Sequence, residues 1–201
     1  MKKHILILLL ISTGFALPVT AQKKLGSVSF AIMALDVDTG SRRILEDAIA
    51  RRLRQNDYQV STSYSIIRDV RDIDTRTVRT RLAEAGFDAV LVIRPVDIGR
   101  EASIESVQQF LTPENYQTIA EFVEDYRGDV FNSRAVIHIV GFVLDATRSL
   151  PVWQGVMWFD EDTHSIEESR DRIVDLVEYN LNYYRPAIRQ QLGFPPLPSS
   201  D

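Results

Sequence analysis

The stretch "DAVLVIRPVDI", Asp88 to Ile98, decides the fold because it is apolar almost without interruption. Apolar residues at successive positions, rather than at alternate ones, are typical of a central strand that is covered on both faces. Pro95 lies within this run, and proline has no N–H to donate, so we expect the strand pairing to fray near it. The stretch therefore predicts a sheet with helices on both sides.

A helix precedes this strand directly. The pattern "DTRTVRTRLAEAG" starts with a cap at Asp74 or Thr75 and ends at Gly86, the position expected of a C′ glycine. Residues at helical spacing are expected to face inward: Val78, Leu82 and Ala85. Further upstream, the patterns predict a strand over 28–35, a helix over 41–56 capped by Ser41, and a strand over 58–63.

Downstream, residues 99–130 read as an acidic, mostly helical insertion. A hairpin around the turn at residues 146–149 follows, and then a long closing helix in which Pro186 predicts a kink or a break. The element order is β-α-β-α-β, the insertion, then β-β-α. This order predicts an α/β (α+β) fold, with helices packed on a mixed sheet. We expect one domain over 28–193 and a disordered tail over 194–201.

The first 21 residues have the pattern of a secretory signal peptide. Lys2 and Lys3 form a basic start, an apolar run follows, and small residues precede an expected cleavage before Gln22. Residues 22–27 are then a short tether. Without the two leader lysines the chain has 21 basic and 28 acidic side chains, a formal charge of −7. We therefore expect a periplasmic protein with no integral membrane segment after cleavage and no nucleic-acid partner.

Residue types that commonly act in catalysis or bind metals are scattered along the chain and form no motif. The chain has no cysteine, which excludes disulfides, thiolate metal sites and a cysteine nucleophile. His138 lies in an apolar strand and is expected to be a packed residue, while His164 lies in an acidic loop. The motif "DVDTGS" begins like a calcium loop, but its sixth position holds Ser41 rather than glycine. We expect no metal, no cofactor and no catalytic residue.

Both tryptophans lie on the last predicted strand. Strand alternation places Trp153, Gly155 and Met157 on one face, and it places Trp158 on the other. The second face also takes Val152, Gln154 and Val156. Since both faces are apolar, we expect helices to cover the strand on both sides; the alternative is an apolar face that is left for a partner.

The segments "GFDAVLVI" (Gly86–Ile93) and "DATRSLPVWQG" (Asp145–Gly155), with the long closing helix, resemble bacterial envelope proteins of the TolB-amino-terminal-like fold. These include penicillin-binding-protein activator, curli-secretion-type and uncharacterised periplasmic lipoprotein families. The chain departs from them at Arg148, where the turn usually has glycine, and in having no cysteine for a lipid. The resemblance implies binding or accessory work and a structural role for its motif residues: Asp88, Asp145, Thr147, Trp153 and Gly155.

Three functions remain open. The leading hypothesis is an exported, non-catalytic accessory module that docks on another protein of the cell envelope, of unknown identity. The residues expected to contact the partner are the aromatic side chains of the insertion and the second tryptophan: Phe110, Tyr116, Phe122, Tyr126 and Trp158. The alternatives are a carrier of a small ligand or lipid with a helical lid, and a hydrolase with a dispersed acidic site. The sequence does not predict an oligomeric state.

Overall fold

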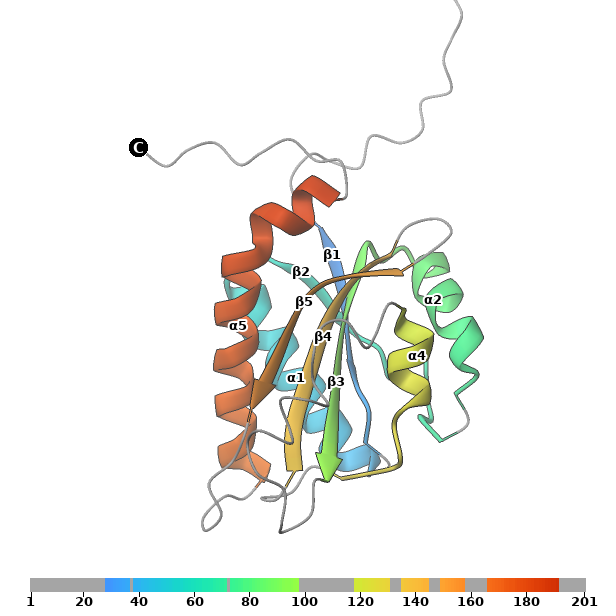
Figure 1. Ribbon diagram of the computed structural model, residues 1–201. Coiled ribbons are helices and arrows are strands. Elements are labelled where there is room, and N and C mark those ends of the chain that lie inside the picture. The colour runs from blue at the N-terminus through green and yellow to red at the C-terminus, as the bar shows by residue number, and fades with distance from the viewer. Residues whose placement is uncertain are drawn as a thin grey trace, which may run out of the picture.

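A mixed sheet forms the centre of the protein. The computed structural model describes residues 28–36, 38–71, 73–97, 118–130, 135–144, 149–157 and 166–191. Within these residues the sheet has five strands in the order β2-β1-β3-β4-β5 (Figure 1). The strands are β1 (Ser29–Ala34), β2 (Gln59–Thr62), β3 (Ala89–Asp97), β4 (Ala135–Leu144) and β5 (Ser149–Met157). β1 pairs in parallel with β2 and β3, and the pairs β3–β4 and β4–β5 are antiparallel.

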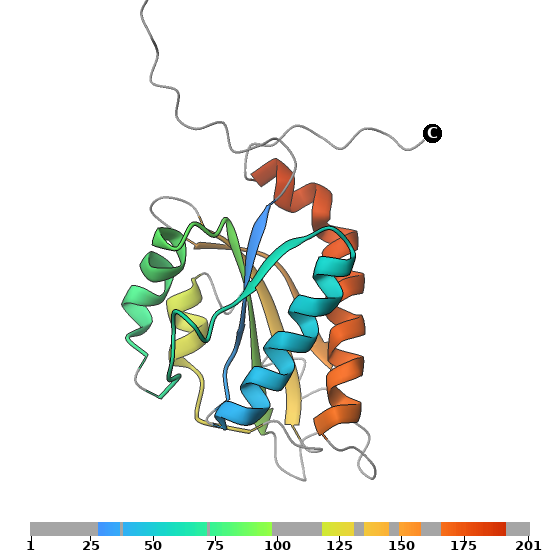
Figure 2. The same ribbon diagram turned by 180° about the vertical axis from the view of Figure 1, so that it is seen from behind.

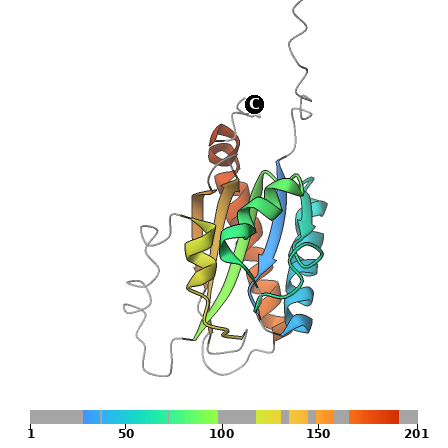
Figure 3. The same ribbon diagram turned by 90° about the vertical axis from the view of Figure 1, so that its right-hand side faces the viewer.

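Helices cover the two faces unequally. The long helices α1 (Thr39–Gln55) and α5 (Ile166–Gln191) lie side by side on one face, as Figure 2 shows from behind. The shorter helices α2 (Thr75–Glu84) and α4 (Ile119–Glu124) lie on the other face and are seen in front of the sheet in Figure 3. The predicted mixed α/β class is confirmed.

The central strand is buried on both faces, as its composition predicts. Ala89, Leu91 and Ile93 of β3 join the core under α1 and α5. Val90 and Val92 join the second core, under α2 and α4. β1 divides its residues between the two cores in the same alternating way.

The prediction that pairing frays at Pro95 is wrong on the β4 side, where the register continues to Asp97. The β1 side does end there, since its register stops at Ala34 with Ile93. The Leu35 N–H donates to the Ile93 carbonyl, so Ile93 turns its backbone groups toward β1. Alternate residues of a strand turn the same way, so the missing N–H of Pro95 faces the side where β1 has already ended.

The helix boundaries differ from prediction at a few positions. α1 is capped by Asp38, not Ser41; the Asp38 carboxylate accepts hydrogen bonds from the Ser41 N–H at 2.9 Å and its hydroxyl at 2.6 Å. Ala85 is the C-cap of α2 and is exposed rather than inward-facing. α5 continues through Pro186 as one helix, and its last turns lean away from the preceding axis in Figure 1.

Gly86 ends α2 as predicted, with φ of +87°. The Gly86 N–H donates to the Ala83 carbonyl at 2.9 Å and the Phe87 N–H to the Leu82 carbonyl at 3.2 Å, the two bonds of a Schellman motif. A Cβ at Gly86 would meet no atom within 4 Å, so only backbone strain opposes substitution.

We expect Gly86→Ala to lower the free energy of unfolding by about 1–2 kcal/mol, because an L-residue is strained in the left-handed region. Gly40→Ala is the matched control. Gly40 lies in the first turn of α1, where a Cβ would approach the Asp38 carboxylate no closer than 3.4 Å. That variant should gain up to about 0.5 kcal/mol. Urea denaturation of both variants measures the contrast, and equal changes would contradict it.

Candidate docking face around α4 and β5

The short helix α4 is held by its own cap and by a bond to the sheet. The Thr118 hydroxyl accepts from the Glu121 N–H at 3.2 Å, while the Glu121 carboxylate accepts from the Thr118 N–H at 3.0 Å. This capping box offsets the small number of internal bonds in a helix of six residues. The Ile119 N–H donates to the Ser149 hydroxyl at 3.0 Å, which ties α4 to the start of β5.

Phe122 of α4 belongs to the core, which differs from the prediction that it faces a partner. Its side chain is fully buried beside Ile119 and Val123, and its ring lies 6.0 Å from the ring of Phe142. Tyr126, just after α4, is half-buried against the same core, and its hydroxyl donates to the Asp129 carbonyl at 2.7 Å. Of these two predicted residues, only Tyr126 has side-chain surface exposed to solvent.

Beneath α4 the apolar core is interrupted by two buried polar side chains, and we call the register row that contains them the polar row. Arg94 of β3, His138 of β4 and Val156 of β5 are register partners across three strands. Buried Arg94 donates to the Phe122 carbonyl at 3.2 Å and to the Asp125 carboxylate at 2.9 Å. The guanidinium carbon also lies 4.3 Å from the centre of the Phe122 ring, a cation–π contact.

His138 is a packed residue, as the sequence predicts. Its ring meets the Phe122 ring edge-on, with centroids 4.9 Å apart, and its Nε2 lies 3.3 Å from the Gln154 side-chain oxygen. Burial lowers the pKa of His138 to about 4, and the Arg94 charge adds to this, while Gln154 and Asp125 oppose it. At neutral pH the ring is therefore uncharged.

β5 departs from simple alternation. Pro151 pairs with Phe142 and Trp153 with Gly141, so Val152 is the extra residue of a β-bulge. Val152 consequently packs with Met157 on the core under α1 and α5, not on the opposite face as predicted.

The predicted full coverage of β5 is also wrong. Val156 is 40% exposed, and Gln154 is half-buried. Gln154 and Val156 lie at the β5 end of the polar row, and Asp125, whose side chain is 43% exposed, binds Arg94 at its β3 end. We call the exposed surface of Asp125, Gln154 and Val156 the α4–β5 face.

Asp88 lies just before β3, and Trp153 and Gly155 lie in β5. Asp88 joins the start of β3 to β1, since its carboxylate accepts from the Ser29 N–H at 3.0 Å and the Ser29 hydroxyl at 2.9 Å. Gly155 pairs with Ile139 in the hairpin. For Trp153 only the backbone is described. The remaining predicted residues lie outside the described residues: Phe110, Tyr116, Asp145, Thr147 and Trp158.

The sequence analysis missed a buried ion pair at the carboxyl ends of β1 and β2. Arg42 and Glu46 of α1 are buried and joined at 2.8 Å. The Glu46 carboxylate also accepts from the N–H groups of Ala34 at 3.1 Å, Ser63 at 2.8 Å and Tyr64 at 3.2 Å. It therefore satisfies backbone donors where the strand ladder stops. The only sequence signal is the Arg-x-x-x-Glu spacing, which is far more often an exposed pair.

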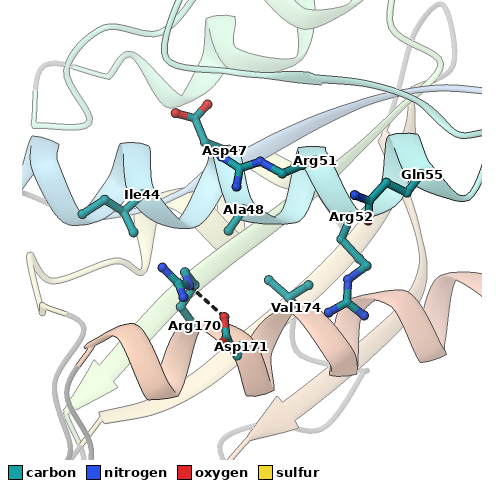
Figure 4. A pocket seen from close by; sticks show the side chains of 9 residues that line it. All are labelled: Ile44, Asp47, Ala48, Arg51, Arg52, Gln55, Arg170, Asp171 and Val174. Atoms are coloured by element: carbon teal, nitrogen blue, oxygen red, sulfur yellow. Dashed lines mark hydrogen bonds and ion pairs between the residues drawn. The ribbon is translucent and has the colours of Figure 1, made fainter.

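A groove of about 400 Å³ lies between α1, from Ile44 to Gln55, and the start of α5 (Figure 4). Its floor is apolar, made by Ala48 and Val174. Its rim carries both charges, from Asp47, Arg51, Arg52, Arg170 and Asp171. Arg52 is already paired with Glu178 at 2.8 Å and Asp175 at 3.2 Å. The groove is therefore a mostly charged gap between the side chains of two packed helices.

The described residues contain no group of three or more histidine, aspartate or glutamate side chains placed to hold a metal ion. Among the helices of the described part, none has the length and apolar character needed to span a bilayer.

Comparison with known proteins adds one distant similarity. No family model matches the chain, and no curated protein matches it. Among solved structures, the chain is similar to lipoprotein GNA1162 from Neisseria meningitidis, with a TM-score of 0.36 and 11% sequence identity. The match covers 75% of this chain and 96% of that one. A similarity of this size carries no assignment of fold family or function.

Proposed function

We propose that this chain is an exported, non-catalytic accessory protein of the bacterial cell envelope that docks on another envelope protein through the α4–β5 face. The observation that carries the docking proposal is Val156: it is 40% exposed on the last strand of the sheet, in register with a buried polar row. An edge strand has backbone groups that no neighbour satisfies, and an apolar side chain beside them favours association. The export proposal rests on the leader pattern of residues 1–21.

The two halves of β5 differ in how well they resist pairing. Pro151 and the bulge at Val152 lie in its first half, and both devices discourage another strand from adding there. From Trp153 to Met157 the register with β4 is regular. The second half is therefore the part to which an extended segment of a partner could add as a sixth strand.

The two alternatives find less support in the described residues. A lipid carrier needs an apolar cavity, whereas the groove between α1 and α5 has a charged rim. A hydrolase with an acidic site needs facing carboxylates or a histidine–carboxylate pair. The described contact of the His138 Nε2 is to Gln154, and Asp125 binds Arg94. The TolB-amino-terminal-like relationship remains part of the proposal.

Affinity capture from envelope extracts tests the docking face. Val156→Asp puts a charge on the proposed contact and should reduce recovery of the captured partner at least tenfold. The matched control is Tyr179→Asp, a residue 68% exposed on α5, on the other side of the sheet. Equal recovery with both variants would contradict the assignment. Point variants are cleaner than deletion of residues 100–128, because deletion would also remove the buried Ile119 and Phe122.

A further inference from the structure

We propose that His138 is an acid-operated latch: when its buried ring takes up a proton, α4 lifts from the sheet and the α4–β5 face is lost. The proposal rests on the docking function above and adds regulation to the same face. An exported protein meets the acidity of the medium directly, so a latch of this kind would release a partner in acid.

The contacts of α4 converge on the polar row. The Phe122 ring lies between the Arg94 guanidinium, 4.3 Å away, and the His138 ring, 4.9 Å away. Arg94 also binds the last turn of α4 through the Phe122 carbonyl and through Asp125. A change of charge at His138 therefore acts directly on the contacts that Phe122 and Arg94 make between α4 and the sheet.

The charges around His138 make a proton costly. β3 contributes Arg94, and β5 contributes only the neutral Gln154 and Val156. The segment after α4 contributes Asp125, which is partly exposed and also pairs with Arg127 at 3.4 Å. Glu121 and Glu124 of α4 are exposed. Among the described residues, protonation would thus place the two cations Arg94 and His138 on neighbouring strands, near the carboxylate of Asp125.

α4 is the element that gives way most easily. β4 is paired along its length with β3 on one side and β5 on the other, so His138 cannot leave without breaking the sheet. α4 has six residues, and it is held by three buried side chains that pack on the sheet and on α2, by the Ser149 bond and by the Arg94 contacts. Lifting α4 admits water to the imidazolium while the strands stay paired, and local opening of this kind costs less than global unfolding.

The size of the effect follows from linkage. With α4 in place, burial holds the pKa of His138 at about 4; once α4 has lifted, the ring should have its ordinary pKa of 6.5. The pKa of His138 is lower when α4 is packed on the sheet than when it has lifted. The packed state is therefore stabilised fully above pH 6.5, and this stabilisation decreases as pH falls toward 4. Between pH 7.5 and pH 4.5, the opening equilibrium of α4 should rise about 70-fold.

Hydrogen exchange on the full chain, without a partner, tests the latch. Protection factors, corrected for intrinsic rates, should fall about 70-fold for the amides of α4 between pH 7.5 and pH 4.5. Those of α1, which lies on the other face of the sheet, should change little. His138→Gln should remove the pH response. Glu121→Gln keeps the response, because it changes only the exposed capping box.

Three results would each overturn the latch. The protection factors of the α4 amides could be independent of pH in the wild type, they could depend on pH as strongly in His138→Gln as in the wild type, or Glu121→Gln could abolish their pH dependence. If His138→Gln does not fold, NMR titration of the His138 ring in the wild type decides, and a pKa near 6.5 would refute the latch. Because no partner is present, failure here leaves docking at neutral pH intact. Conversely, loss of the docking assignment does not alter the exchange result.

Discussion

Replacing Arg42 with methionine should lower the free energy of unfolding by about 3–5 kcal/mol, because it leaves the buried Glu46 carboxylate without its counter-charge. Glu46 would still accept its three backbone N–H bonds, so the carboxylate cannot turn away to water. Urea denaturation at pH 7 measures the loss.

The effect of Arg42→Met should shrink in acid. Burial raises the pKa of Glu46, and the charge of Arg42 opposes that rise. Without Arg42 the pKa must rise further. A carboxyl whose pKa is higher in the folded state than in the unfolded state stabilises the fold when protonated, and this contribution is lost as pH rises. The gap between variant and wild type should therefore narrow from pH 7 toward pH 5.

Arg52→Met is the matched control for this prediction. Arg52 lies on the same helix and has two acidic partners at similar distances, but its side chain is 42% exposed. Exposed pairs contribute little, so the loss should be below about 1 kcal/mol. Equal losses at positions 42 and 52 would show that burial of the pair has no energetic consequence.

Phe122→Ala should lower the free energy of unfolding by about 3–5 kcal/mol, because the ring is fully buried and shared by α4 and the sheet. It also removes the cation–π contact of Arg94 and the ring contact of His138. Thermal or urea denaturation of the variant measures the loss.

Phe122→Leu and Tyr126→Ala separate core packing from partner contact. Leucine keeps most of the apolar volume and should lose less than about 2 kcal/mol. Tyr126 is half-buried, so its removal should also lose less than Phe122→Ala. If Phe122→Ala were as stable as the wild type while partner capture failed, Phe122 would be a docking residue and not a core residue.

The sequence predicts those elements that are determined by residues within the element itself. The unbroken apolar run of β3 predicts a strand between two layers, and Gly86 predicts the end of α2, because only the pattern or the backbone angle of that residue matters. The mixed sheet follows from the order of such elements.

The features that sequence analysis misses depend on what lies across the fold. Arg42 and Glu46 have the spacing of a surface pair, and only the ends of β1 and β2 make their burial favourable. The sequence predicts Phe122 at a partner surface because nothing in the local sequence indicates that it packs on Phe142. Val152 changes face because of a bulge opposite Gly141 and Phe142, which strict alternation cannot foresee.

Site-specific photo-crosslinking in the living cell would show whether a partner contacts the α4–β5 face. A photoreactive amino acid would replace Val156 in one chain and Tyr179, on the far helix, in another, each expressed in the bacterium of origin. We expect one discrete protein adduct from position 156 and none of that size from position 179. The same adduct from both positions, or from position 179 alone, would contradict docking on that face.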